Sequence, residues 1–227
     1  MKPKKNFIIV TTSLKGGVGK TQICASAATL FFIYRIPVIT IDADIQQSLF
    51  RHRQRDLAAH PKAVTPWDCV FLNTMDYQST EEMIERAKQY PCCVFIDCPG
   101  NINDPSLKLV FEAADIAIVP FELNSDSVDA TVIFAQLFKK HFNAKMFFVP
   151  NKVSALYLKR GDIRKAREDA MEMLDKKLGV VTPDIKLTTY MNGYSTLELL
   201  SPEKRRIIKE AVNPILVPIW KLYNRGQ

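Results

Sequence analysis

The sequence lacks several features that would assign it to common protein classes. It has no apolar run near the roughly 18 residues of a membrane-spanning helix, and the apolar stretch after its charged start is too short for a signal peptide. Its five cysteines are an odd number without a Cys-x-x-Cys pair, which favours free thiols in a reducing cytoplasm over a disulfide framework. The histidines, His52, His60 and His141, are scattered without metal-ligand spacing.

What is present is the composition of an ordinary globular protein. The chain has 227 residues, of which 47% are hydrophobic and 24% are charged, enough for one well-buried core. We therefore expect a single domain over residues 1–227. The net charge of +7 at pH 7 favours binding to polyanions, although charge alone identifies no partner.

Short apolar runs alternate with helical patterns along the chain. The predicted strands are Phe7–Thr12, Val38–Ile41, Cys69–Leu72, Cys93–Ile96, Ile116–Val119 and Lys145–Val149. The predicted helices are Lys20–Tyr34, Gln47–Ala59, Thr80–Gln89, Pro105–Ala113 and Ser125–Phe142, with Ser79 and Asp104 suited to capping two of them. This alternation predicts an α/β fold, a mostly parallel twisted sheet with helices on both faces. Ligands of such sheets bind at the carboxyl ends of the strands.

One segment after the first predicted strand has the pattern of a phosphate-binding loop. Residues 14–21 read LKGGVGKT, which matches G-x-x-x-x-G-K-[ST] except that leucine replaces the first glycine and Lys15 follows it. The glycines let successive backbone N–H groups converge on phosphate oxygens at the N-terminus of the next helix. Lys20 would then reach the β- and γ-phosphates, and the Thr21 hydroxyl would ligate Mg²⁺. The predicted nucleotide-binding residues here are Gly16, Gly17, Val18, Gly19, Lys20, Thr21 and Gln22.

A glycine-rich turn without a ligand is the alternative interpretation of this segment. Such a turn would connect the strand to the helix equally well, but it has no need for Gly-Lys-Thr at its end.

Aspartates follow two of the predicted strands. Asp42 and Asp44 come after the second strand, where they could hold an outer-shell Mg²⁺ and orient an attacking water. Asp97 ends the fourth strand, the expected position of the second carboxylate on the Mg²⁺ side, and Pro99-Gly100 begins a segment able to respond to the γ-phosphate. The alternative is structural, with Asp44 as the cap of the next helix and Asp97 in a cap or turn.

Four motifs occur in a fixed order along the chain. They are KGGVGKT with Lys15, DADIQQS from Asp42, FIDCPG from Phe95 and AADIAIVPFELNSDSVDA from Ala113. Together they resemble the ParA/MinD family of deviant Walker A ATPases, and most closely its short ParA-type partition proteins, over about residues 5–200. The resemblance implies a P-loop NTPase fold, binding of ATP or ADP with Mg²⁺, and slow ATP hydrolysis used as a switch.

The resemblance also implies roles for individual residues. ATP would hold a homodimer with the nucleotides at its seam, and Lys15 would reach across to the partner subunit's nucleotide. Lys15 and Lys20 would neutralise phosphate charge, and Asp44 would position the attacking water. Asn151, after the last predicted strand, would contact adenine.

The chain departs from the family pattern in three places. Gln22 stands where many relatives have a second threonine, so a contact to the α-phosphate is lost or made by an amide. Ile45 replaces the proline of the usual Asp-Pro-Gln step, which affects the hydrolysis rate and not the fold. Only six residues precede the first predicted strand, so we do not expect the N-terminal DNA-binding domain of longer partition proteins or operator-specific repression.

Basic residues of the C-terminal half are candidates for binding DNA. ATP-bound dimers of the family bind DNA nonspecifically, and contacts to the phosphate backbone require no base-reading side chains. The alternative is a solvated helix face, because acidic residues are interspersed. The two clusters are Lys159, Arg160, Arg164, Lys165 and Arg167, and Lys204, Arg205, Arg206 and Lys209.

Two weaker signals concern other members of the same superfamily. Cys92 and Cys93 would point to opposite faces of a strand, which favours structural thiols over an iron–sulfur cluster like that of the nitrogenase iron protein. The apolar segment Ile207–Tyr223 resembles the membrane-targeting helix of MinD. Pro214 and Pro218 are expected to interrupt a continuous amphipathic helix, so packing against the core is favoured.

The sequence therefore predicts a cytoplasmic, ParA-like partition ATPase. ATP would promote dimerisation and nonspecific DNA binding on the nucleoid, and hydrolysis stimulated by a ParB-like partner protein would reset the switch. The cargo would be a plasmid or another DNA element, and no membrane partner is expected. The alternatives are a MinD-like positioning ATPase at a membrane surface and a metabolic enzyme on the same fold.

Overall fold

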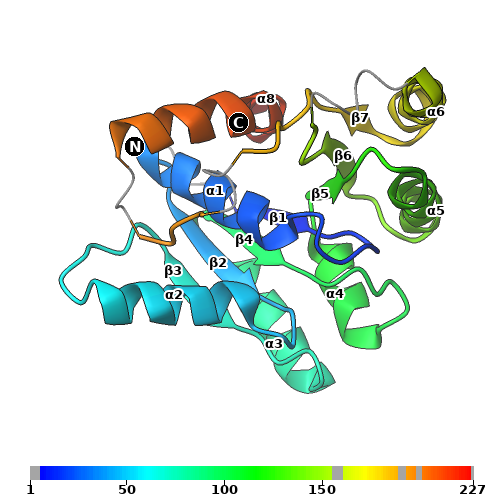
Figure 1. Cartoon of the computed structure of the whole chain (residues 1–227). Helices are drawn as coiled ribbons and strands as arrows, with labels where there is room; N and C mark the ends of the chain where they lie inside the picture. Colours follow the sequence, from blue (N-terminus) through cyan, green and yellow to red (C-terminus); the bar gives the residue numbers. More distant parts are fainter. Residues whose placement is uncertain (1–5, 155–160, 189–192, 198–200, 226–227) are drawn as a thin grey trace.

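The fold is built on a seven-stranded parallel sheet with helices on both faces (Figure 1). The structure, a computed structural model, describes residues 6–154, 161–188, 193–197 and 201–225. The spatial order of the strands is β3-β2-β4-β1-β5-β6-β7, and every neighbouring pair is parallel. This confirms the predicted α/β class and parallel sheet.

Six of the strands coincide with predicted ones, and the sequence pattern did not reveal the seventh, β7, because it has only two residues. The strands are β1 (Phe7–Thr11), β2 (Val38–Asp42), β3 (Asp68–Phe71), β4 (Cys93–Asp97), β5 (Ile116–Phe121), β6 (Lys145–Pro150) and β7 (Val180–Val181).

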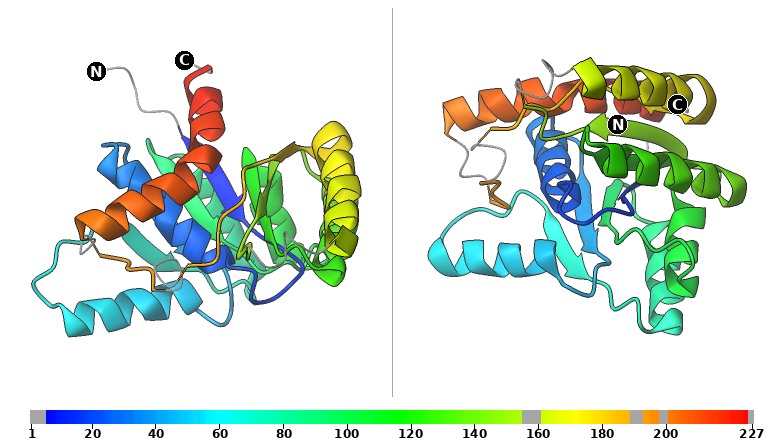
Figure 2. Two further views of the ribbon diagram at one scale, coloured as in Figure 1. Left: turned by 45° about the horizontal axis from the view of Figure 1, so that its top comes forward. Right: turned by 45° about the vertical axis from the view of Figure 1, so that its right-hand side comes forward.

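The helices divide between the two faces of the sheet. On one face α1 (Lys20–Ile33) packs against α8 (Pro202–Arg225), and α2 (Ser48–Ala59) adds Leu49 to the same core. The other face is covered by α3 (Tyr77–Ala87), α4 (Pro105–Ala113) and α5 (Ser125–His141). Beside α5 lies α6 (Gly161–Met173), which continues as the π-helix η2 (Leu174–Leu178) (Figure 2).

Because both faces are covered, the central strands are apolar on both sides. Ile8 and Val10 of β1 belong to the core under α3, α4 and α5, whereas Ile9 belongs to the core under α1 and α8. The same alternation separates Cys92 from Cys93, which lie in different cores as predicted.

In the described part of the chain, four helices begin at a side chain that accepts a hydrogen bond from the first turn, and in α8 this is Ser201, which accepts from Lys204 N at 3.2 Å. Asp104 caps α4 as predicted, accepting from Leu107 N, and Asn124 caps α5. The predicted start of α3 is wrong, because this helix begins at Tyr77 and is capped by Asp76, not by Ser79. A carboxylate earlier in the chain can satisfy the same free N–H groups, and it starts the helix one turn sooner.

The expectation that prolines divide the C-terminal segment is also wrong. The helix α8 continues through Pro214 and Pro218, and it bends along its length (Figure 2). A proline removes one backbone hydrogen bond and kinks a helix, but burial of the apolar side can outweigh that loss. That side packs against the core as predicted, and there it lies on α1, since Val212, Ile215 and Ile219 are completely buried.

Truncation of the buried side of α8 should destabilise the protein. Ile215→Ala should lower the free energy of unfolding by about 2 to 4 kcal/mol, since it leaves a cavity against α1. The matched variant Val217→Ala removes a side chain that is 49% exposed and should change it by less than about 0.5 kcal/mol. Urea denaturation measures both values. Equal effects of the two substitutions would contradict the packing of α8.

Candidate functional site

The phosphate-loop sequence connects β1 to the N-terminus of α1, at the carboxyl edge of the sheet (Figure 1). Gly17 and Gly19 have φ angles of +74° and +96°, in the left-handed region that other residues rarely adopt. A Cβ atom on Gly19 would also collide with the side chain of Asn151. The local backbone therefore requires glycine at both positions.

The two lysines of the loop have different environments. Lys15 is exposed, and its backbone carbonyl accepts a hydrogen bond of 3.2 Å from Nζ of the half-buried Lys20. Lys20 and the half-buried Thr21 begin α1, where free backbone N–H groups favour anions. Both side chains thus lie at the end of the helix that would face a phosphate.

Asp42 is buried and uses both carboxylate oxygens within the protein. Oδ1 accepts from Asp44 N at 3.1 Å, and Oδ2 accepts from Phe50 N in the first turn of α2 at 2.9 Å. Burial raises the pKa of this carboxyl, and the backbone hydrogen bonds oppose the shift. The structural alternative for Asp44 is wrong, because Asp42 binds the free N–H group of α2 and Asp44 accepts from Gln46 N instead.

Asp97 is the unusual group of the site. It is 2% exposed, and neither carboxylate oxygen forms a hydrogen bond of good geometry in the described part of the chain. Burial raises its pKa from an ordinary 3.8 to about 7, while the nearby Thr21 hydroxyl and, more weakly, the Lys20 ammonium oppose that shift. A buried carboxylate without a partner is costly, so this position favours a ligand that supplies positive charge.

The residues around Asp97 fit a magnesium ion that is shared with phosphate oxygens. Thr21 offers a hydroxyl, and Asp42 is the register partner of Asp97 on the neighbouring strand. Within the described ranges, no group of three or more His, Cys, Asp or Glu side chains could hold a metal. Mg²⁺ commonly binds through one or two carboxylates together with substrate phosphates, so this donor set is suitable.

The segment after Asp97 lies directly against the end of β1. The Thr12 hydroxyl donates to the Pro99 carbonyl at 3.0 Å, and a Cβ atom on Gly100 would collide with the backbone of Ser13. Residues 98–100 are therefore close to the start of the phosphate loop. This contact connects the two segments that the sequence assigned to the γ-phosphate.

Asn151 and Gln22 both lie beneath the loop. Asn151 is 2% exposed and donates from Nδ2 to the Val18 carbonyl at 2.7 Å, whereas Nε2 of the buried Gln22 has no partner among the described residues. The neighbouring Lys152 donates from Nζ to the Gly17 carbonyl and forms an ion pair of 3.2 Å with Glu122. Sequence reasoning missed Lys152 and Glu122, although both follow strands at the ligand edge.

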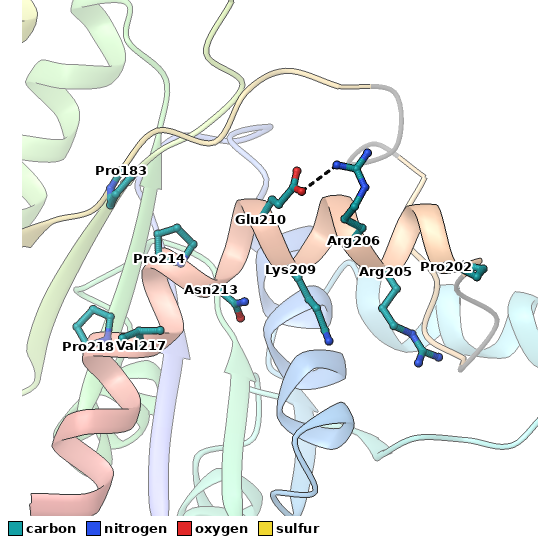
Figure 3. Close-up of a pocket in the computed structure, with 10 residues that line it drawn as sticks. All are labelled: Pro183, Pro202, Arg205, Arg206, Lys209, Glu210, Asn213, Pro214, Val217 and Pro218. Carbon is teal, nitrogen blue, oxygen red and sulfur yellow. Dashed lines mark hydrogen bonds and ion pairs between the residues drawn. The ribbon is translucent and has the colours of Figure 1, made fainter.

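The predicted DNA-binding residues are only partly described. Lys159 and Arg160 lie outside the described residues, and Arg164 lies on α6. Lys204, Arg205 and Arg206 lie in the first turns of α8, and the two arginines line a cavity of about 930 Å³ that is separate from the phosphate loop (Figure 3). Arg206 forms an ion pair of 2.9 Å with Glu210, one turn further along the exposed side of α8.

A known protein-family model matches most of this chain. The model of the CobQ/CobB/MinD/ParA nucleotide binding domain matches residues 9–192. The chain belongs to this family. The match includes the phosphate loop and the three aspartates, and it confirms the ParA/MinD resemblance. Comparison with curated protein sequences gave no match.

Solved structures of the family share the fold at low identity. A plasmid partition protein of Borrelia burgdorferi bound to AMPPNP is 18% identical, with a TM-score of 0.69 over 95% of this chain and 100% of that chain. MinD of Aquifex aeolicus is 18% identical, with a TM-score of 0.69 over 92% and 96%. The ParA protein of pNOB8 bound to nonspecific DNA is 15% identical, with a TM-score of 0.57 over 92% and 98%.

The described part of the chain has no helix whose length and apolar character would allow it to cross a bilayer. In particular α8, the longest helix, carries charged side chains along its exposed side.

The raised pKa of Asp97 predicts a pH-dependent stability. In the folded protein without nucleotide and Mg²⁺, a pKa of about 7 against an ordinary 3.8 means that the stability from the protonated carboxyl is fully present below pH 3.8 and is lost progressively as pH rises to about 7. Asp97→Asn cannot ionise, so it should exceed the wild type in free energy of unfolding at pH 8 by at most about 4 kcal/mol, with little difference at pH 4. Urea denaturation at both pH values measures this difference.

The control for this experiment is Asp169→Asn, which changes an exposed carboxylate on α6. Its effect on the free energy of unfolding should be small and the same at both pH values. A difference between Asp97→Asn and wild type that does not grow with pH would contradict the assignment.

Proposed function

We propose that this protein is a ParA-like ATPase, a Mg²⁺-ATP-dependent dimerisation switch coupled to nonspecific DNA binding. The observation that carries the proposal is the unpaired, buried carboxylate of Asp97 beside Thr21, at the base of a loop that reads KGGVGKT. Metal with phosphate relieves that buried charge better than any side chain in the vicinity.

Each residue of the site would have a separate role in phosphoryl transfer. Backbone N–H groups of Gly17, Val18 and Gly19 bind the phosphates, and Lys20 exchanges the Lys15 carbonyl for β- and γ-phosphate oxygens. Thr21 and Asp97 would hold the magnesium ion, and Asp42 would contribute as an outer-shell carboxylate. When bound, this ion neutralises charge that develops on the phosphate oxygens.

Asp44 is suited to orienting the attacking water. It is half-buried at the end of β2, and its Oδ1 accepts from Gln46 N at 2.9 Å, which fixes the carboxylate within its turn. Within the described residues, Oδ2 forms no hydrogen bond and remains available for the water. No covalent intermediate with the enzyme is required.

Exposed apolar side chains at the carboxyl edge of the sheet support the proposed dimer. Leu14, Ile45 and Met75 follow β1, β2 and β3, and they are 44%, 59% and 79% exposed. Apolar side chains that gather beside a binding site favour a protein partner. Lys15 is exposed at the same edge. In a dimer formed through this edge, Lys15 of each subunit would reach the nucleotide bound to the other subunit.

The proposed DNA surface includes the basic residues Lys204, Arg205 and Arg206 in the first turns of α8, of which Arg205 and Arg206 point to different sides of the helix (Figure 3). The pNOB8 ParA structure, which contains nonspecific DNA, supports this part of the proposal by likeness of fold. A ParB-like protein would stimulate hydrolysis and release the DNA, which would serve the segregation of a plasmid or another DNA element.

Lys15→Ala should spare folding and weaken dimerisation that depends on ATP. Sedimentation velocity with Mg²⁺ and ATP, in an Asp44→Ala background that keeps ATP intact, measures the dimer fraction. The expected dissociation constant rises at least about tenfold, because the partner subunit's phosphate charge loses its lysine. The control Lys62→Ala removes an exposed lysine far from the loop in sequence. A Lys15→Ala protein that dimerises normally with ATP would contradict the proposed role of Lys15 in the dimer.

Binding to duplex DNA and to anionic vesicles, each with ATP, ADP and no nucleotide, tests the proposed function directly. DNA binding should require ATP and weaken with salt. The variant Lys204→Ala/Arg206→Ala should reduce the salt slope by about 2, because each lost phosphate contact contributes about 0.9. Lys62→Ala/Lys108→Ala, which removes two exposed charges, is the control. Vesicle binding without DNA binding at low salt would favour a MinD-like protein instead.

A further inference from the structure

Two consecutive residues after β6 bind two consecutive carbonyl groups of the phosphate loop. Asn151 donates from Nδ2 to the Val18 carbonyl at 2.7 Å, and Lys152 donates from Nζ to the Gly17 carbonyl. Both donors approach from the side of β6, a strand at the ligand edge. The loop is therefore held from outside by side chains that are distant in sequence.

The peptide geometry gives these contacts a consequence for phosphate binding. In a trans peptide the C=O and N–H groups point in opposite directions, so fixing one fixes the other. The Gly17 carbonyl shares a peptide with the N–H group of Val18, and the Val18 carbonyl shares one with the N–H group of Gly19. Donors on these carbonyls hold both N–H groups toward the opposite side, where a phosphate would lie.

External anchoring matters here because the loop is rich in glycine. Gly17 and Gly19 have positive φ angles, and glycine changes between regions of φ and ψ more readily than other residues do. Without an anchor the intervening peptides could rotate and present carbonyl oxygens to the phosphate. The bonds from Asn151 and Lys152 oppose that rotation.

Lys152 is itself held in place by two features. Its φ angle of +55° lies in the left-handed region, which is uncommon for a residue with a side chain. Its ammonium group forms an ion pair of 3.2 Å with Glu122, which follows β5, and Glu122 N donates to the Ser127 hydroxyl at 3.0 Å. The ends of β5 and β6 and the phosphate loop are thus linked through one side chain.

We propose that Lys152 is a positioning residue for the nucleotide, which orients the Val18 N–H group through the Gly17 carbonyl and is itself aligned by Glu122. This inference rests on the proposed nucleotide site and adds a residue that the loop motif does not contain. The Gly17–Val18 peptide would face phosphates that ATP and ADP share. The affinities for ATP and for ADP should therefore depend on Lys152 to the same extent.

The test measures dissociation constants of fluorescent ATP and ADP analogues for the full chain, together with KM and kcat for hydrolysis. Lys152→Met keeps the apolar stem and removes the donor. It should raise the dissociation constants of both nucleotides about tenfold, a factor that corresponds to about 1.4 kcal/mol. It should also raise KM with little change in kcat. Lys152→Arg retains a charged donor and should restore most of the affinity.

Two further variants separate positioning from charge. Lys186→Met removes an exposed lysine near the same edge, next to Val153 in a β-bridge, and should bind nucleotide within twofold of the wild type. Glu122→Gln leaves Lys152 in place without its ion pair and should have an intermediate affinity. In ¹⁵N spectra of the nucleotide-free protein, Lys152→Met should shift the Val18 and Gly19 amide signals, whereas Lys186→Met should not.

The outcomes are distinguishable. Failure of the wild type to bind either nucleotide would reject the proposed function itself. Nucleotide binding by the wild type with Lys152→Met equal to Lys186→Met would reject the positioning role alone. If Lys152→Met does not fold, Lys152→Gln repeats the test. Loss of folding in both variants would also overturn the proposal, because it would assign Lys152 to stability.

Discussion

The parallel register of β2, β4 and β1 is the constraint on which the site depends. It pairs Asp42 with Asp97 and Asp97 with Thr11, so that all three strands end at one level. The phosphate loop begins after β1, and the segments that contain Asp44 and Pro99-Gly100 begin after β2 and β4. Because a parallel sheet aligns strand ends in this way, segments that are about 30 to 80 residues apart in the chain meet around one small volume.

That arrangement buries charge before any ligand is present. Asp42 is compensated by two backbone N–H groups, whereas Asp97 has no hydrogen bond of good geometry among the described residues. Asp42 therefore stabilises the turn into α2, whereas Asp97 is the carboxylate to which we assign a cation in the proposed function. The nucleotide-free protein thus retains an unfavourable electrostatic energy that ligand binding can release.

The conformation of the phosphate loop depends only in part on the residues of the loop itself. Its glycines supply the left-handed angles, but the carbonyls of Gly17 and Val18 are held by residues that follow β6. A cradle of N–H groups is useful only if its peptides keep one orientation, and in a flexible segment that orientation must come from neighbours. In this protein the strands on one side of β1 supply the carboxylates, and those on the other side supply the donors that support the loop.

Much of the fold and of the site could be predicted from the sequence, for reasons that are local. Apolar runs such as those of β1 and β4 identify buried strands, and GGVGKT identifies the loop, because these depend on the period and backbone needs of short segments. The start of α3, the continuity of α8 and the strand β7 could not be predicted in the same way. Each depends on a competition between local preference and burial that only the packed structure resolves.

The sequence by itself determined which groups lie at the ligand edge, since Asp42, Asp97 and Asn151 all stand at or just after strand ends. Tertiary structure decided what each group does. In the folded protein, backbone N–H groups donate to the carboxylate of Asp42, whereas the carboxylate of Asp97 has no such hydrogen bond among the described residues. Asn151 and Lys152 donate to carbonyl groups of the loop. The physical reason is that hydrogen bonding is settled by distance and burial in three dimensions, which residue type and spacing do not specify.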